Sequence, residues 1–201
     1  MVRSQGAAKS GEIDATALTS PQDEVRLIGQ VARGERGAFE ALYRLYHPRL
    51  TRFLSNLLRK PELVEEVLND TLMAVWRSPD SYNGASKLST WIFAIAYRKA
   101  LRARSRLDEP MEDSDAESRP SDEAGPEQQL GQRQVQKVLL SAMDGLSAAH
   151  RTVVDLTYFH EMGHREIAEI MACPVDTVKT RVFHARGYLK NALAGRLADW
   201  L

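Results

Sequence analysis

Apolar residues recur every three to four positions through most of the chain, which is the period of an amphipathic α-helix. No segment shows the convincing alternation of apolar and polar residues that a β-strand requires. In the segment 23–46 the apolar positions line one helical face on each side of a break at Gly34–Gly37. The same period predicts further helices in the first half of the chain at 49–58, 62–76 and 89–106.

The second half of the chain repeats this helical pattern after a stretch of different composition. Residues 108–129 contain three prolines, one glycine and almost no residue that a core could bury, which is typical of a flexible linker. Residues 1–22 are expected to form a disordered tail for the same reason. Four helices are expected beyond the linker, at 130–143, 147–160, 164–171 and 176–194. The pattern predicts an all-α protein with two small helical domains, at 23–107 and 130–201.

The charge distribution follows the same division. The net charge is zero, but residues 1–107 carry 17 Lys and Arg against 11 Asp and Glu. Residues 108–130 carry one arginine against nine acids, and residues 131–201 carry nine cations against seven acids. Two mildly basic segments are therefore separated by a strongly acidic one, which a global pI near 7 does not reveal.

Cysteine usage and hydropathy indicate where the protein acts. The single cysteine, Cys173, cannot form an internal disulfide and fits a reducing compartment. No apolar run approaches the ~20 residues that a membrane-spanning helix needs. The N-terminal residues lack the apolar core of a secretory signal. We therefore expect a cytoplasmic protein.

The stretch His160–His164 reads HEMGH and matches the H-E-x-x-H pattern of zinc peptidases, in which two histidines one helical turn apart bind the metal. That chemistry requires both rings on one uninterrupted helix, whereas Gly163 stands between them, just before a new apolar run. No glutamate follows Glu169, so a downstream glutamate ligand is missing. We therefore expect no metal site, no catalytic residue and no cofactor.

A helix-turn-helix is indicated between residues 164 and 194, where a short apolar helix and a longer helix flank a tight turn at Ala172–Pro174. The second helix of such a unit enters the major groove with its N-terminal residues toward the base edges. Val178, Val182 and Leu189 would form its buried stripe. A plain helical hairpin with a solvated basic face is the alternative. The polar candidates for DNA contact are Thr177, Lys179, Thr180, Arg181, His184 and Arg186.

The first domain contains a second candidate surface for nucleic acid. Single-stranded DNA requires cations for its phosphates and aromatic rings for its unstacked bases. Trp91 and Tyr97 precede a basic run, and Tyr82 lies in the loop before them; Trp91 is the better candidate for the core, and the two tyrosines for contact. The basic run contains no acid and consists of Arg98, Lys99, Arg102, Arg104 and Arg106.

The stretch at 70–101, DTLMAVWRSPDSYNGASKLSTWIFAIAYRKAL, closely resembles region 2 of the extracytoplasmic-function (ECF) sigma factors of bacterial RNA polymerase. The stretch at 146–193, which includes EIAEIMACPVDTVKTRVFHARGYLK, resembles their region 4. The likeness covers about residues 23–107 and 130–195, in the family's order. It implies a two-domain initiation factor of the sigma-70 family that directs core polymerase to promoters and catalyses no reaction itself.

The resemblance also implies roles for particular residues. The residues that would dock on the β′ clamp helices of the polymerase are Glu65, Glu66, Asn69 and Asp70. The surface that would recognise and melt the −10 element, including a loop at 81–87 for a flipped base, contains Tyr82, Asn83, Lys87, Trp91, Tyr97, Arg98, Lys99, Arg102 and Arg106. The −35 reader would comprise Thr177, Lys179, Thr180, Arg181, Phe183, His184 and Arg186.

Further partners follow from the resemblance. The second domain would also meet the β flap, and the active factor would be a monomer bound to polymerase and promoter DNA. A cognate anti-sigma factor, often membrane-anchored and sometimes zinc-binding, would wedge between the two domains until a stress or envelope signal releases it. The residues alone leave a stand-alone helix-turn-helix regulator as the alternative.

Overall fold

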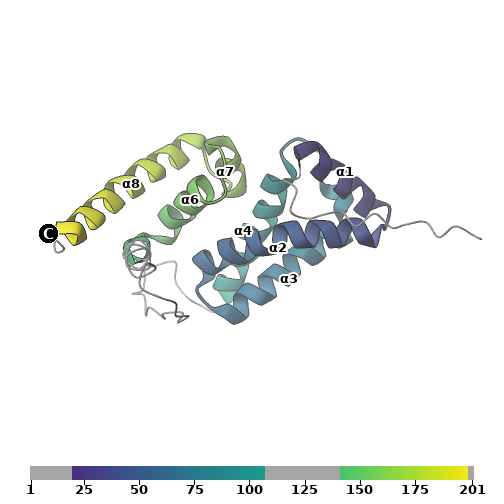
Figure 1. The fold of residues 1–201 in the computed structure, drawn as a ribbon, viewed down its shortest axis with the longest axis horizontal. Helices are drawn as coiled ribbons and strands as arrows, with labels where there is room; N and C mark the ends of the chain where they lie inside the picture. Colours follow the sequence, from purple (N-terminus) through teal and green to yellow (C-terminus); the bar gives the residue numbers. More distant parts are fainter. Residues whose placement is uncertain (1–19, 107–140, 199–201) are drawn as a thin grey trace, which may run out of the picture.

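The computed structural model describes residues 20–106 and 141–198, and all regular structure in these two ranges is helical. The first domain comprises α1 (Pro21–Ala32), α2 (Arg36–Leu58), α3 (Pro61–Arg77), the short 3-10 helix η1 (Pro79–Ser81) and α4 (Leu88–Arg106). The second domain comprises α6 (Ala148–Tyr158), α7 (His164–Ile170) and α8 (Val175–Ala198). The predicted all-α fold with two small helical domains is confirmed (Figure 1).

Parts of the sequence-based scheme lie outside the described residues, namely the linker at 108–129, most of the helix expected at 130–143 and residues 1–19 of the expected tail. None of the helices in the described part of the chain combines the length and the hydrophobicity that crossing a membrane would require.

The first helix starts earlier than the sequence pattern indicated. Pro21 opens α1 within the segment expected to be a tail, and Ser20 caps it. The Ser20 hydroxyl oxygen accepts a hydrogen bond from the Asp23 N–H at 3.2 Å, and the Asp23 carboxylate accepts one from the Ser20 N–H, also at 3.2 Å. This reciprocal capping box satisfies two backbone donors that the first turn would otherwise leave unpaired.

The structure corrects the prediction of a separate helix at 49–58. Instead, α2 runs without interruption from Arg36 to Leu58 and contains Pro48. A proline inside a helix removes one backbone hydrogen bond and costs about 3 kcal/mol. Apolar burial on both sides offsets this cost, because Tyr46 and Leu50 have no exposed surface. The predicted break between α1 and α2 is present, and Gly34 there has a φ of 80°, which favours glycine.

A buried hydrogen bond also links α1 to α2. The Tyr46 hydroxyl donates a hydrogen bond of 2.9 Å to the Glu24 carboxylate. Burial raises the pKa of the Glu24 carboxyl, although the hydrogen bond from Tyr46 opposes this shift. Burial and the Glu24 charge together raise the pKa of the Tyr46 phenol above its ordinary value. The pair therefore satisfies two polar groups that would otherwise be costly in the domain interior.

One apolar core extends through both domains. The aromatic rings of Phe53 in α2 and Phe93 in α4 lie 5.2 Å apart at the centre of the first domain. Leu156 of α6 and Ile167 of α7 belong to the same buried cluster and are fully buried. Accordingly, α6 packs on α2 and α7 packs on α4 (Figure 1). The second domain therefore buries much of its apolar surface against the first.

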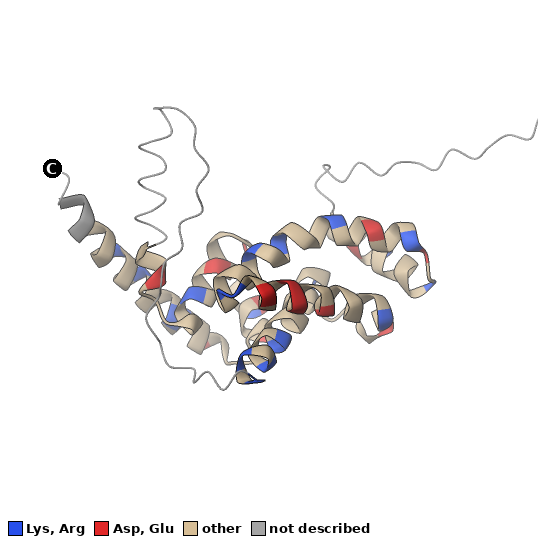
Figure 2. Cartoon of the chain, turned by 90° about the horizontal axis from the view of Figure 1, so that it is seen from below, with Lys and Arg blue, Asp and Glu red and all other residues tan. Residues whose placement is uncertain are grey.

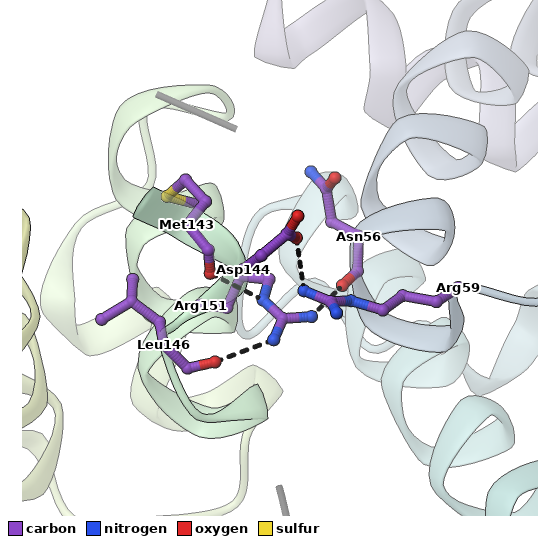
Figure 3. A network of polar contacts seen from close by, with 6 residues as sticks. All are labelled: Asn56, Arg59, Met143, Asp144, Leu146 and Arg151. Carbon is purple, nitrogen blue, oxygen red and sulfur yellow. Dashed lines mark hydrogen bonds and ion pairs between the residues drawn. The ribbon is translucent and has the colours of Figure 1, made fainter. Parts of the chain in front are cut away.

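Polar groups border this shared core (Figure 3). The Arg59 guanidinium of the first domain forms an ion pair of 2.6 Å with Asp144 of the second. Arg151 of α6 donates a hydrogen bond of 3.4 Å across the junction to the backbone carbonyl of Asn56. Arg151 also donates to two carbonyls of its own domain, at 3.2 Å and 2.8 Å, which fixes the segment that leads into α6. The Arg151 guanidinium thus links the second domain to the C-terminal end of α2.

A buried carboxylate completes the junction. Asp155 of α6 is 1% exposed, and its Oδ1 accepts a hydrogen bond of 2.7 Å from the Asn56 side chain of α2. Its Oδ2 lies 3.3 Å from Nε2 of His160. The His160 ring packs edge-on against Phe93 with centroids 4.8 Å apart. A carboxyl group with so little solvent requires polar neighbours, and its hydrogen bond from Asn56 links α6 to α2.

Removing two methyl groups from the core should destabilise the fold, whereas the same change on the surface should not. Val75 of α3 is 1% exposed, so we expect Val75→Ala to lower the free energy of unfolding by about 2 kcal/mol. Val25 of α1 is 49% exposed, so Val25→Ala should change it by less than ~0.5 kcal/mol. Urea unfolding followed by far-ultraviolet circular dichroism measures both values. Equal losses in the two variants would contradict the assigned core.

Candidate nucleic-acid interface

The end of the second domain has helix-turn-helix geometry. Ile170 ends α7, Ala172 in the turn has a φ of 50°, and α8 begins at Val175. The Cys173 N–H donates a hydrogen bond of 3.0 Å to the carbonyl of Ala168, which closes the turn. On α8 the predicted stripe packs inward: Val178 and Val182 are buried, and Leu189 is partly buried. This packing places α8 against both α6 and α7, with its opposite face free to enter a major groove.

The opposite face of α8 carries the residues predicted to read DNA. Phe183 is 73% exposed, an unusual value for a phenylalanine, and its ring contacts His184 edge-on at 5.6 Å. Lys179 is paired with Asp176 at 2.9 Å, and the Arg181 side chain reaches back to the Cys173 sulfur at 3.8 Å. Exposed on this face are Lys179, Thr180, Phe183, His184 and Arg186, whereas Thr177 and Arg181 are partly buried.

The basic face of α4 is also largely open to solvent. Arg98, Arg102 and Arg106 are exposed, and Lys99 is partly buried. Two of these cations pair with α3: the guanidinium of Arg106 lies 3.4 Å from Glu66, and the Lys99 ammonium lies 3.4 Å from Asp70. Exposed ion pairs of this kind contribute only about 0.2 to 1 kcal/mol, so a phosphate can displace the carboxylates.

The loop before α4 is held in shape by its own hydrogen bonds. The Tyr82 hydroxyl donates to the carbonyl of Ser86 at 2.7 Å, and the Asn83 side chain accepts from the backbone of Ala85 at 3.0 Å. The Tyr82 ring lies 5.6 Å from the ring of Trp91, centroid to centroid. Both rings pack against the core but are only partly buried, so part of each ring faces solvent.

The acidic residues of α3 form a separate exposed surface. Glu65, Glu66, Asn69 and Asp70 are all exposed, and Figure 2 shows acidic positions gathered on one helix of the first domain. Met73, one turn further along, is 43% exposed and extends this surface with an apolar side chain. The sequence pattern did not predict that Met73 is exposed, because an apolar residue in a helical repeat is ordinarily assigned to the core.

The two histidines of the HEMGH stretch lie in different parts of the second domain. Tyr158 ends α6, His164 begins α7, and Glu161 between them has a φ of 53°. The two histidines therefore do not share a helix, and the His160 side chain is only 3% exposed, in the apolar junction between the domains. Within the described ranges, no cluster of three or more His, Cys, Asp or Glu could hold a metal ion.

A contact between the domains involves one of the predicted DNA-binding residues. The Lys87 ammonium lies 3.0 Å from the carboxylate of Glu166 on α7, and the Thr90 hydroxyl donates to the same carboxylate at 3.2 Å. Burial alone would raise the pKa of Glu166, but the Gly163 N–H and Lys87 together lower it. No sequence signal marked Glu166 or Thr90 as contact residues, since helical spacing does not identify a partner in another domain.

Comparison with known proteins assigns the two domains separately. Residues 42–109 match the family model described as Sigma-70 region 2, and residues 136–189 match the one described as Sigma-70, region 4. The ECF RNA polymerase sigma-E factor of Haemophilus influenzae is 27% identical over 177 residues, covering 83% of this chain and 93% of that protein. The RNA polymerase sigma-H factor of Pseudomonas aeruginosa is 27% identical over 192 residues, covering 90% and 99%.

Solved structures agree with these sequence matches. The sigma factor RpoE of Bartonella quintana, in complex with the anti-sigma factor NepR, superimposes with a TM-score of 0.57 at 29% identity, covering 78% of this chain and 96% of that one. CnrH, in complex with the cytosolic domain of CnrY, superimposes with a TM-score of 0.62 at 22% identity, covering 86% and 97%. The latter likeness supports the fold. With both regions present in the family's order, this chain belongs to the ECF branch of the sigma-70 family of RNA polymerase sigma factors.

Proposed function

We propose that the protein is an alternative sigma factor that binds core RNA polymerase and directs it to a specific set of promoters. The observation that carries this function is the pairing of two different surfaces for DNA on two domains of one chain. A stand-alone repressor needs one reader, usually repeated by dimerisation, whereas this chain carries a recognition helix on α8 and a basic, aromatic-bordered face on α4.

We assign the −35 element to the exposed face of α8 and the −10 element to α4 and the loop before it. Exposed cations and the Phe183 ring on α8 can contact base edges and phosphates in the major groove. The arginines of α4 can follow the phosphates of a melted strand, while Tyr82 and Tyr97 offer partly exposed rings to its bases. The acids on α3, together with Met73, would form the surface for the β′ clamp helices.

An anti-sigma factor is the proposed regulator, and its action belongs in the cytoplasm, where the polymerase works. Sigma factors of this branch are initiation factors without catalysis of their own, so control has to act on access to polymerase and DNA. The solved complex of a Bartonella quintana relative with the anti-sigma factor NepR supports such a partner. Membrane anchoring and zinc binding, where present, would be properties of that partner.

The direct test is transcription in vitro from fragmented genomic DNA of the source organism. Its core polymerase is used with and without the protein, and RNA 5′ ends are mapped. We expect new start sites that share two spaced upstream elements. If the protein neither binds core polymerase nor creates new starts, but binds a duplex site tightly by itself, the repressor function replaces the sigma function.

An exposed aromatic side chain on α8 provides the first residue-level prediction. Phe183 is 73% exposed and contributes little to the core, so Phe183→Ala should leave the melting temperature unchanged. Transcription from promoters that depend on the −35 element should fall roughly tenfold, since one lost base-edge contact costs about 1 to 3 kcal/mol. Tyr158→Ala, at a 51% exposed position in α6, is the matched control and should transcribe normally. Equal activity of the two variants would show that Phe183 does not contribute to recognition of the −35 element.

Charge reversal on α3 tests the polymerase-binding surface. Glu65 is exposed on α3. Glu65→Lys should therefore weaken binding to core polymerase roughly tenfold, and the loss should be smaller at high salt, which screens charges. The control variant Glu169→Lys changes the net charge of the protein by the same amount at an exposed position of α7, and it should bind polymerase as tightly as the wild type. Fluorescence anisotropy of labelled protein with core polymerase measures both affinities. Equal affinities for the two variants would show that polymerase docks elsewhere.

A further inference from the structure

Glu24 of α1 places a half-buried carboxylate near the loop that we assign to the −10 element. This carboxylate accepts a hydrogen bond of 2.9 Å from the Tyr46 hydroxyl of α2. Burial raises the pKa of its carboxyl group, whereas the hydrogen bond from Tyr46 and the charges of Arg49 and Lys87 oppose this shift. Burial and the Glu24 charge likewise raise the pKa of the Tyr82 phenol. The Glu24 charge therefore acts on Tyr82 and Lys87, which stand near the two ends of this loop.

The surroundings of this carboxylate keep it in a defined position. Tyr46 has no exposed surface, so close packing limits the movement of its hydroxyl group. The Arg49 guanidinium lies over the Tyr46 ring, 5.1 Å from its centroid, and over the Phe93 ring at 5.6 Å. The capping box at Ser20 stabilises the first turn of α1, to which Glu24 belongs. Glu24 is therefore held by two helices, unlike a carboxylate at the end of a free surface side chain.

Internal hydrogen bonds give the loop its shape, and α1 contributes to its placement on the domain. The Tyr82 hydroxyl donates to the carbonyl of Ser86 at 2.7 Å, which closes the loop on itself. Gly84 at its tip has a φ of 73°, and among the described residues an added Cβ there would meet nothing within 4 Å. At its base, α1 packs on η1, and the Tyr82 ring lies 5.6 Å from the Trp91 ring. The open tip can therefore receive a base, while the base of the loop depends on α1 and Trp91.

A negative charge at this place favours selectivity over affinity. It repels the phosphates that Lys87 would attract, so it cannot strengthen the binding of DNA in general. It does attract the Lys87 ammonium and so restricts where that group lies, and polar groups discriminate between bases only when they are held in position. Lys87 is also paired with Glu166 of the second domain at 3.0 Å. Of the two carboxylates, Glu24 belongs to the domain that carries the loop.

We propose that Glu24 is a positioning residue that sets the base preference of the −10 loop, by holding Lys87 and the Tyr82 end of the loop in place without contacting DNA itself. The Tyr46 hydroxyl orients the carboxylate, so Glu24 and Tyr46 act as one unit. This inference rests on the proposed assignment of the loop at 81–87 to the −10 element. It gives α1 a specific role in promoter recognition.

Two variants of the full-length chain each remove one part of this unit. Glu24→Gln removes the charge, while its amide oxygen can still accept the hydrogen bond from Tyr46. Tyr46→Phe keeps the charge and the buried ring but removes the hydrogen bond. Glu40→Gln, at an exposed position of α2, is the matched control for the change of charge. Val31→Ala, at a 3% exposed position of α1, is the control for weaker packing of that helix.

The measurement is the affinity of polymerase holoenzyme for fork-junction DNA that carries a −10 element mapped by the transcription experiment. The same affinity is measured with each other base at the −10 position where the wild type tolerates substitution least. We expect Glu24→Gln to reduce the preference for the cognate base about fivefold, with unchanged or higher affinity for the substituted sequences. Tyr46→Phe should reduce the preference by a similar factor, and the double variant should reduce it no further, because the two residues act together. Both control variants should keep the wild-type preference.

Three results would overturn the proposal. The first is a wild-type base preference in Glu24→Gln. The second is an equal loss of affinity for all the sequences, because a damaged fold weakens cognate and substituted DNA alike. The third is the same reduced preference in Val31→Ala, because the packing of α1 rather than its carboxylate would then be responsible.

Asn83→Ala and Lys87→Ala test the underlying assignment of the loop separately, with the same set of DNA sequences. If neither variant changes the base preference, the loop does not read the −10 element, and the proposed function of the loop fails together with the role of Glu24. If they change the preference but Glu24→Gln does not, only the role of Glu24 is refuted.

Discussion

The apolar junction between the two domains is the constraint on which the remaining features depend. Phe53 and Phe93 form the centre of the first domain, and Leu156 and Ile167 of the second domain join the same buried cluster. A helix as short as α7 has little stability of its own, so its place is determined by what it packs on. Because α7 packs on α4, the turn that follows α7 and the start of α8 lie beside α4, the helix proposed to bind the −10 element.

The sequence was a good guide to the elements and to surface positions within each domain. Helical period located the buried stripe of α8, since that stripe follows from spacing along a single helix, whereas the acids of α3 were predicted from the family resemblance. The continuity of α2 through Pro48 was missed, because the cost of a proline is local whereas the burial that offsets it involves other helices. A rule based on neighbours in sequence cannot weigh these two effects against each other.

The hydrophobic pattern could not predict the contacts between the domains, for a related reason. The apolar positions of α6 and α7 look the same whether they pack within their own domain or against α2 and α4. The family resemblance implied that Lys87 and Tyr97 contact DNA, and it gave no indication that both lie beside the second domain in the structure. His160 illustrates the point: the sequence analysis predicted no metal site at its motif but could not predict its neighbours, which are Asp155 and two aromatic rings.

The junction between the two domains is chemically mixed. Alongside the apolar contacts it contains a buried carboxylate, a histidine ring and the Arg52 guanidinium stacked 3.8 Å from the Phe159 ring centroid. Polar groups of this kind can be solvated again when the domains part, whereas a purely aliphatic interface offers water no such replacement. Ion pairs such as Arg59–Asp144 are partly exposed and each contributes little. The junction therefore combines apolar burial with polar contacts that water can replace.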